Sequence, residues 1–221
     1  MKNNFDTLAE CQLILGSAQL GSKYGITNHT GIQSDRAINE LINFANKEEI
    51  KFIDTARSYG NAEKRLGNSF ASLNFYPKVT TKLSLGIRHD NQKSIQQVLE
   101  KEIQASLSNL KLSKLYCVLL HNYEEFELYG NDLMNALDCY VKNEIVEKIG
   151  VSVYTPNEAL KCLEEKRVTC MQIPFNILDT RWTQKDLINL FQKRVDVEFH
   201  VRSIFLQGLL INKAEFWPSF V

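Results

Sequence analysis

The sequence predicts an α/β protein in which one parallel sheet curls into a (β/α) barrel. Short apolar runs alternate with longer segments of helical periodicity along the chain, and strands joined by helix-length connections run parallel. A doubly wound open sheet is the alternative, and it usually has a Gly-rich phosphate loop after its first strand. Residues 16–21, Gly-Ser-Ala-Gln-Leu-Gly, do not match that loop, which favours the barrel.

Seven strands are expected, each from a short apolar or β-branched run. They cover residues 13–16, 52–54, 78–83, 115–120, 149–153, 168–173 and 197–203. The run at 115–120 is continuously apolar, as expected of a parallel strand that is buried on both faces. No linker or low-complexity segment interrupts the series, so we interpret residues 1–221 as one domain.

Six helices are expected between these strands. The clearest spans residues 95–110, where apolar residues recur at steps of three and four. Thr155-Pro156-Asn157-Glu158 predicts a helix start, because Thr is a good N-cap, Pro suits the first helical position and Glu completes a capping box. The others are expected at residues 35–48, from about residue 62, at residues 132–142 and after Thr183.

The composition argues against several classes of protein. Lys plus Arg and Asp plus Glu each total 26, and a net charge of zero gives no reason to expect nucleic acid or an anionic membrane as partner. The apolar runs are too short to cross a bilayer, and five scattered cysteines are typical of reduced thiols in a cytoplasm. No cluster of His, Cys or carboxylate residues has ligand spacing, so no metal is expected. His200 is expected to pack within the last strand.

Candidate functional residues follow from one rule of barrel architecture. In a (β/α) barrel, the side chains that do chemistry lie at the carboxyl ends of the strands. The rule selects Asp54, Tyr59, Lys82 and His121 from strands two to four, and Ser152, Gln172, Asn176, Arg202 and Ser203 from strands five to seven. Four titratable groups are therefore expected on one side of one mouth.

These four groups suit the reduction of a carbonyl. A Tyr with a pKa near ~10 is a poor proton donor at neutral pH, and the Lys82 ammonium is expected to lower that pKa while Asp54 balances the Lys charge. Tyr59 would then protonate a carbonyl oxygen as a hydride from a nicotinamide reaches the carbon. His121 would orient the carbonyl through a hydrogen bond.

The same residues resemble those of a known family. Residues 52–63, Phe-Ile-Asp-Thr-Ala-Arg-Ser-Tyr-Gly-Asn-Ala-Glu, resemble the aldo-keto reductase signature Asp-Thr-Ala-x-x-Tyr-Gly-x-x-Glu. Four later segments resemble further conserved blocks of that family and occur in the right order: Thr80-Thr81-Lys82, Leu120-His121, Gly150-Val151-Ser152 and Met171-Gln172. The resemblance implies a cytoplasmic oxidoreductase that uses NADPH to reduce an aldehyde or ketone, with Tyr59 as general acid. It also implies that Ser152 and Gln172 hold the nicotinamide carboxamide.

The sequence departs from the family pattern at two positions of the expected cofactor site. Many members have Asn directly after the Ser of strand five, where this chain has Val153. Many also stack an aromatic ring on the nicotinamide from strand seven, where this chain has Arg202. A guanidinium plane can stack as well, so Arg202 and the adjacent Ser203 are kept as cofactor-binding residues.

The resemblance also suggests a sub-type. Residues 15–21, 24–26 and 202–210 resemble a bacterial branch of the family whose members often accompany surface-polysaccharide biosynthesis. That branch implies a sugar-derived carbonyl as the substrate.

The end of the chain leads to a further expectation. After Leu210 the family continues with a helix, an eighth strand and a final helical region that carries much of the pocket for the adenosine 2′-phosphate. We therefore expect an incomplete (β/α)8 barrel of the TIM type, truncated at its C-terminus, whose first and seventh strands have open edges that invite self-association. The alternative to an active reductase is an inactive truncated remnant that acts, if at all, as a binding or assembly module.

Overall fold

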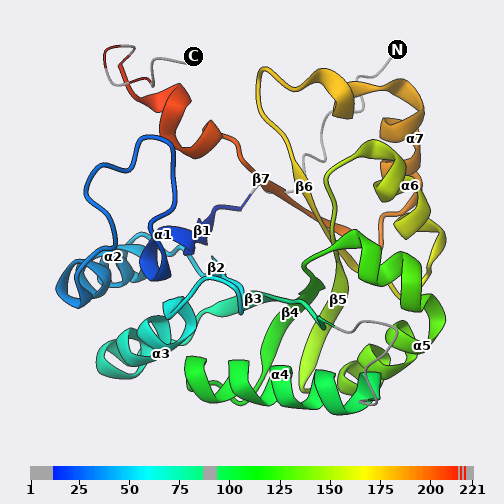
Figure 1. The fold of residues 1–221 in the computed structure, drawn as a ribbon, viewed down its shortest axis with the longest axis horizontal. Coiled ribbons are helices and arrows are strands. Elements are labelled where there is room, and N and C mark those ends of the chain that lie inside the picture. Colours follow the sequence, from blue (N-terminus) through cyan, green and yellow to red (C-terminus); the bar gives the residue numbers. More distant parts are fainter. Residues whose placement is uncertain (1–11, 87–93, 214, 216, 218–221) are drawn as a thin grey trace.

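The computed structural model describes residues 12–86, 94–213, 215 and 217, and it confirms the expected fold (Figure 1). Seven parallel strands follow one another in the order of the sequence. They are β1 (Ile14–Gly16), β2 (Phe52–Asp54), β3 (Lys78–Leu83), β4 (Leu115–Leu120), β5 (Val146–Ser152), β6 (Cys170–Pro174) and β7 (Glu198–Arg202). An unbroken sequential order is the topology of a barrel, whereas a doubly wound sheet reverses its strand order.

Helices cover the outer side of the curled sheet (Figure 1). They are α1 (Ala18–Gly21), α2 (Asp35–Lys47), α3 (Ala62–Leu73), α4 (Ile95–Leu110), α5 (Tyr123–Lys142), α6 (Pro156–Glu164) and α7 (Lys185–Lys193), with the 3-10 helices η1 (Thr180–Thr183) and η2 (Leu206–Ile211). In the part of the chain that the structure describes, no helix is both long and apolar enough to cross a membrane.

Local sequence signals explain where several helices begin. The capping box expected at Thr155 is present: the Thr155 hydroxyl accepts from the Glu158 amide, and the Glu158 carboxylate accepts from the Thr155 amide. A second capping box joins Ser94 and Gln97 at the start of α4. Helix α5 starts at Tyr123 rather than at residue 132, and it consists of two helical segments that meet at a kink at Gly130, with φ +35°.

Each strand divides its side chains between the helices and the barrel interior. In β3, Val79 and Leu83 belong to the apolar core that the sheet shares with the helices, together with Leu66 of α3 and Ile103 of α4. The alternate position Lys82 points into the interior, because successive side chains of a strand face opposite ways. This alternation explains how a lysine can be as buried as its apolar neighbours.

The two edge strands are linked by the segments that follow them. Within the described residues β1 and β7 do not pair with each other, but η2 reaches the loop after β1. The Ile26 amide donates to the Gln207 side chain (3.1 Å), and the Thr27 hydroxyl donates to the Gln207 carbonyl (3.1 Å). Gly208, with φ +94°, allows this approach, since a Cβ there would lie 2.4 Å from the Thr27 hydroxyl.

Candidate active site

The strand ends surround one cavity of about 540 Å³ at the mouth of the barrel, a size typical of small-molecule sites. Eight of the nine residues that the strand-end rule selects line it: Asp54, Tyr59, Lys82, His121, Ser152, Gln172, Arg202 and Ser203. Asn176 does not line it, and its side-chain oxygen accepts from the Leu178 amide instead. The barrel rule and the register of the strands together explain this convergence, because parallel strands bring their carboxyl ends to the same edge.

Asp54 and Lys82 form a buried ion pair at the base of this cavity. The Lys82 ammonium donates to both Asp54 carboxylate oxygens (2.8 and 2.6 Å) and to the Thr55 carbonyl (2.9 Å). An ammonium has three hydrogens, so all of them are used. Burial lowers the pKa of Lys82, whose side chain is only 1% exposed, and the Asp54 charge opposes that effect.

Tyr59 lies beside this ion pair but is not bonded to it. The Lys82 ammonium lies 5.1 Å from the centre of the Tyr59 ring. Burial raises the pKa of Tyr59, and the Asp54 charge raises it further. The expected lowering of this pKa is therefore wrong, because the phenol is largely removed from water and lies in the field of the Asp54 carboxylate.

The turn that presents Tyr59 depends on the glycine that follows it. The Ala62 amide donates to the Tyr59 carbonyl (3.0 Å), and Gly60 takes a left-handed φ of +56°. A Cβ on Gly60 would lie 2.3 Å from the Gly21 carbonyl, so helix α1 packs directly on this turn. The Tyr-Gly pair of the sequence thus fixes the phenol through backbone contact.

His121 lies across from the phenol. Its ring centroid is 6.0 Å from that of Tyr59, with the rings nearly perpendicular at 82°. Burial lowers the pKa of His121, and the Lys82 charge lowers it further, so the imidazole is neutral at neutral pH. Its Nδ1 lies 3.2 Å from the Ser58 hydroxyl. Ser58 was not predicted as a site residue, and its position inside the Asp54–Tyr59 block was the available signal.

Gln172 and Ser152 are directly paired residues of β6 and β5. The Gln172 amide donates to an Asp54 carboxylate oxygen (2.8 Å), and the Ser152 hydroxyl is 3.5 Å from the Gln172 carbonyl oxygen. The two cofactor-site candidates are therefore connected to the Asp54–Lys82 pair. We call Asp54, Lys82, Ser152 and Gln172 the mouth cluster.

Arg202 closes the other side of the cavity. Its guanidinium lies 4.2 Å from the centre of the Tyr154 ring and donates to the Val153 carbonyl (3.2 Å) and the Ser203 hydroxyl (3.4 Å). The stacking ability expected of Arg202 is thus used on Tyr154 in this structure. Ser203 has a left-handed φ of +62° and begins the turn toward η2.

Glu63, the last residue of the signature block, serves a structural purpose. Its carboxylate is buried and accepts from Arg57 (2.8 Å), Thr81 (2.8 Å), Ser106 (2.8 Å) and Asn109 (3.3 Å). These donors come from the Tyr59 loop, β3 and α4, so Glu63 ties the active-site loop to the sheet. The motif spacing indicated that Glu63 belongs to the block but did not indicate this role.

A second group of charged residues, from β4, β5 and β7, meets around Glu198, and His200 of this group also lines the mouth cavity. Glu198 accepts from the Tyr116 hydroxyl, from Lys148 (2.9 Å) and from His200 (2.7 Å). We call these four residues the floor cluster. His200 was expected to pack in its strand, but it forms an ion pair with Glu198. The two residues are two positions apart in β7, so their side chains lie on the same, interior face of the strand.

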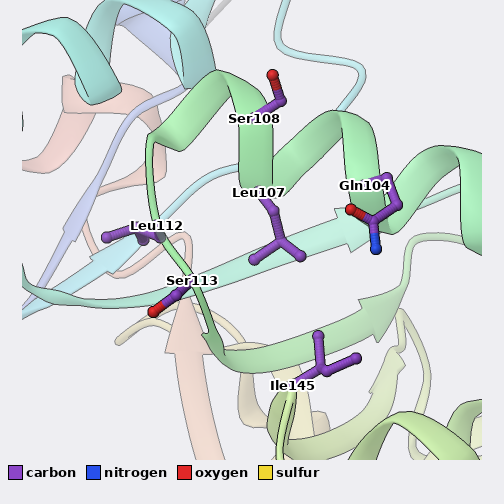
Figure 2. Close-up of a pocket in the computed structure, with 6 residues that line it drawn as sticks. All are labelled: Gln104, Leu107, Ser108, Leu112, Ser113 and Ile145. Carbon is purple, nitrogen blue, oxygen red and sulfur yellow. The ribbon is translucent and has the colours of Figure 1, made fainter.

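A different hollow lies outside the barrel, where α4 meets the start of β4 (Figure 2). Its volume is about 380 Å³, and it is lined by Gln104, Leu107, Ser108, Leu112, Ser113 and Ile145. None of these side chains ionises near neutral pH, so this hollow offers no acid, base or charge for chemistry. The mouth cavity, which gathers titratable groups from the ends of several strands, is the candidate active site.

Known proteins agree with this interpretation of the fold. A model of the "Aldo/keto reductase family" matches residues 12–218. Among solved structures, a Pseudomonas aeruginosa protein described as an aldo-keto reductase has a TM-score of 0.69 at 21% identity, over 86% of this chain and 72% of that one. The glycerol dehydrogenase of Gluconobacter oxydans has a TM-score of 0.70 at 21% identity, over 94% of this chain and 65% of that one.

A third structure adds a ligand to the comparison. An aldo/keto reductase from Klebsiella pneumoniae, crystallised with NADP and acetate, has a TM-score of 0.68 at 15% identity, over 88% of this chain and 65% of that one. No curated protein matches the sequence. The structural likenesses show the fold, and the family model covers nearly the whole chain, so this chain belongs to the aldo/keto reductase family of oxidoreductases.

Proposed function

We propose that this protein uses NADPH to reduce an aldehyde or ketone, with Tyr59 as the general acid. The observation that carries the proposal is the placement of Tyr59, His121 and the Asp54–Lys82 pair around one cavity. A phenol, a neutral imidazole and a buried ammonium together provide a proton, an orienting hydrogen bond and a positive charge, which are what reduction of a carbonyl requires.

The raised pKa of Tyr59 is compatible with this role. A general acid must carry its proton when the substrate binds, and a phenol with a raised pKa is fully protonated at neutral pH. As the carbonyl carbon gains a hydride, its oxygen becomes an alkoxide, which is a stronger base than a phenolate. The proton of Tyr59 then passes to that oxygen and leaves a phenolate. The centre of its ring lies 5.1 Å from the positively charged Lys82 ammonium.

His121 is assigned the orienting role. If the Ser58 hydroxyl donates to Nδ1, the ring proton resides on Nε2, from which the imidazole donates to the carbonyl oxygen. The lowered pKa keeps the ring neutral, so it polarises the carbonyl without competing with Tyr59 to transfer the proton.

The residues on the other side of the cavity suit a nicotinamide amide group. Ser152 and Gln172 are 2% and 3% exposed, and their mutual contact of 3.5 Å is long for a hydrogen bond between side chains. Both therefore have a hydrogen-bonding atom to offer a carboxamide, and Arg202 and Ser203 complete that wall. The nicotinamide supplies the hydride, as implied for a family whose Klebsiella member was crystallised with NADP.

The substrate is proposed to be a small carbonyl compound, with keto-sugars among the first to test. NADPH oxidation, followed by absorbance with a panel of aldehydes and keto-sugars, is the direct assay. Tyr59→Phe removes only the proton donor and should lower kcat/KM by about 10²–10⁴-fold.

Tyr116→Phe is the matched control for this assay. The Tyr116 hydroxyl donates to Glu198 of the floor cluster and does not line the mouth cavity, so turnover should change by less than about twofold. Loss of this hydrogen bond to a charged group should lower the free energy of unfolding by about 1.5–3 kcal/mol. Equal turnover by Tyr59→Phe and the wild type would remove Tyr59 from the mechanism. Failure to bind NADPH at all would favour a binding or assembly role instead.

We also propose self-association through the open edges of the sheet. Within the described residues, β1 and β7 each pair on one side only, and Leu13 and Val201 beside those edges are 73% and 41% exposed. Sedimentation at increasing concentration should show a dimer or larger species, and Val201→Lys should weaken it. A monomer at every concentration would contradict this proposal.

A further inference from the structure

The charges around the mouth cavity are unevenly paired. Lys82 is neutralised by Asp54 at 2.6 Å, and His200 is paired with Glu198 at 2.7 Å. Arg202 has no carboxylate within ion-pair distance among the residues that the structure describes. A permanently charged guanidinium therefore lines the cavity, and no described residue supplies a counterion for it.

The Arg202 side chain is nevertheless held in a defined position. One face stacks on the Tyr154 ring at 4.2 Å, and two hydrogens are directed at neutral oxygens of Val153 and Ser203 (3.2 and 3.4 Å). A guanidinium has five N–H groups, so three have no partner in the described part of the protein. A fixed guanidinium with free N–H groups is suited to bind a carboxylate or phosphate through paired hydrogen bonds.

Arg202 lines the same cavity as the reacting groups. Its positive charge lowers the pKa of Tyr59, of Lys82 and of His121, in addition to the larger effects on each, so its field reaches all three. In a nicotinamide cofactor, a ribose separates the reactive ring from the nearest phosphate. An anionic group that reaches both Arg202 and the vicinity of Tyr59 therefore belongs more naturally to the substrate than to the cofactor.

We propose that Arg202 selects carbonyl substrates that carry a carboxylate or phosphate group. This proposal rests on the proposed carbonyl reduction and specifies its substrate class. Ile204 and Phe205, which are 48% and 55% exposed, line the same cavity and provide an apolar wall for the carbon framework between the anionic group and the carbonyl. The cavity thus offers a proton donor at one side and an anion site at the other.

Two aldehydes that differ only in charge test the proposal. The wild type should reduce 4-carboxybenzaldehyde with a kcat/KM at least about tenfold above that of its methyl ester, mainly through a lower KM. In Arg202→Gln the ratio of the two values should fall to about one, and in Arg202→Lys it should be partly retained because the charge remains. An unchanged ratio in Arg202→Gln, or a wild type that prefers the ester, would overturn the proposal.

The cofactor phosphates are the other source of anionic charge, and the ratio separates them from the substrate. If Arg202→Gln lowers kcat/KM for both aldehydes equally and raises the KM for NADPH, the guanidinium serves the cofactor and the proposal is wrong. Effects shared by both aldehydes cancel in the ratio, so a contribution of Arg202 to cofactor binding does not obscure the result.

A binding measurement keeps this proposal separate from the proposed reaction. If the wild type reduces neither aldehyde, carbonyl reduction fails as a function, but the anion site is still measurable by calorimetry. Benzoate should then bind at least about tenfold more tightly than benzamide, and Arg202→Gln should abolish the difference. Equal binding of the two compounds by the wild type would reject the anion site.

Discussion

The mouth cluster and the floor cluster are two networks of charged and polar residues inside one barrel. Each joins a carboxylate to a lysine, Asp54 to Lys82 and Glu198 to Lys148. At the floor, the pKa of Glu198 is lowered to about 2, chiefly through its hydrogen bond with His200. Only the mouth cluster lies wholly along the cavity, together with Tyr59 and His121.

This difference shows that a perturbed pKa is insufficient to locate an active site. At the floor, the charged groups contact one another, so the shifts report structural pairing. At the mouth, paired charges lie beside two groups that are free to meet a ligand. Cavity and charge together, rather than charge alone, distinguish the candidate site.

The largest expected effect is on kcat/KM, when the lysine of each cluster is replaced in turn by methionine. Lys82→Met removes the cation beside Tyr59 and leaves Asp54 without its main partner, so kcat/KM should fall by about 10²–10⁴-fold. Lys148→Met removes a cation that is 28% exposed and pairs with Glu198 away from the cavity, so kcat/KM should stay within about twofold. Steady-state kinetics of the two variants measure the contrast, and similar losses in both would remove the distinction between the clusters.

A smaller effect is expected from pH on the floor cluster. Burial disfavours the charged His200, but its contacts with Cys170 and Glu198 outweigh burial and raise its pKa to about 10. A raised pKa contributes stability that is complete below the unfolded value near ~6.5 and is lost as pH rises through about 10. The lowered pKa of Glu198 contributes stability that is complete above the unfolded value near ~4.3 and is lost as pH falls through about 2.

The Glu198–His200 pair should therefore contribute most to stability between pH ~4.3 and ~6.5, and the free energy of unfolding should decline below and above this range. Denaturant titrations across this range, with Glu198→Gln as the control, measure it. The variant should be less stable by about 1.5–3 kcal/mol within the window and should show a flatter profile outside it. Parallel profiles for the two proteins would show that Glu198 and His200 do not titrate as a pair.

The smallest expected effect concerns the mouth itself. Ser58→Ala removes the hydroxyl 3.2 Å from the His121 Nδ1, so the ring loses the partner that selects its tautomer. Turnover should fall by about three- to tenfold, within the range of one neutral hydrogen bond, with little change in stability because Ser58 is exposed. Ser58→Thr retains a hydroxyl and should restore most of the rate; equal loss in both variants would argue against a role in positioning His121.

Much of the site could be predicted because its residues obey a local rule. Asp54, Lys82 and His121 each stand at or just after the end of an apolar run, and all line the cavity as expected. Helix starts with explicit capping signals, such as Thr155, were also placed correctly. The start of α5 was missed although Tyr123, Phe126 and Tyr129 recur at steps of three and pack in or against the core before the kink at Gly130.

The sequence by itself determined the succession of the strands and, through the strand ends, most of the residues around the mouth, because periodicity and strand ends are local properties. Only the tertiary structure decided the partners and the protonation of those residues. Gln172 binds Asp54 across 118 positions, Tyr59 gains a raised pKa from burial, and Arg202 has no carboxylate partner in the described part of the chain. Desolvation and ion pairing depend on distances between strands that the residue order does not contain.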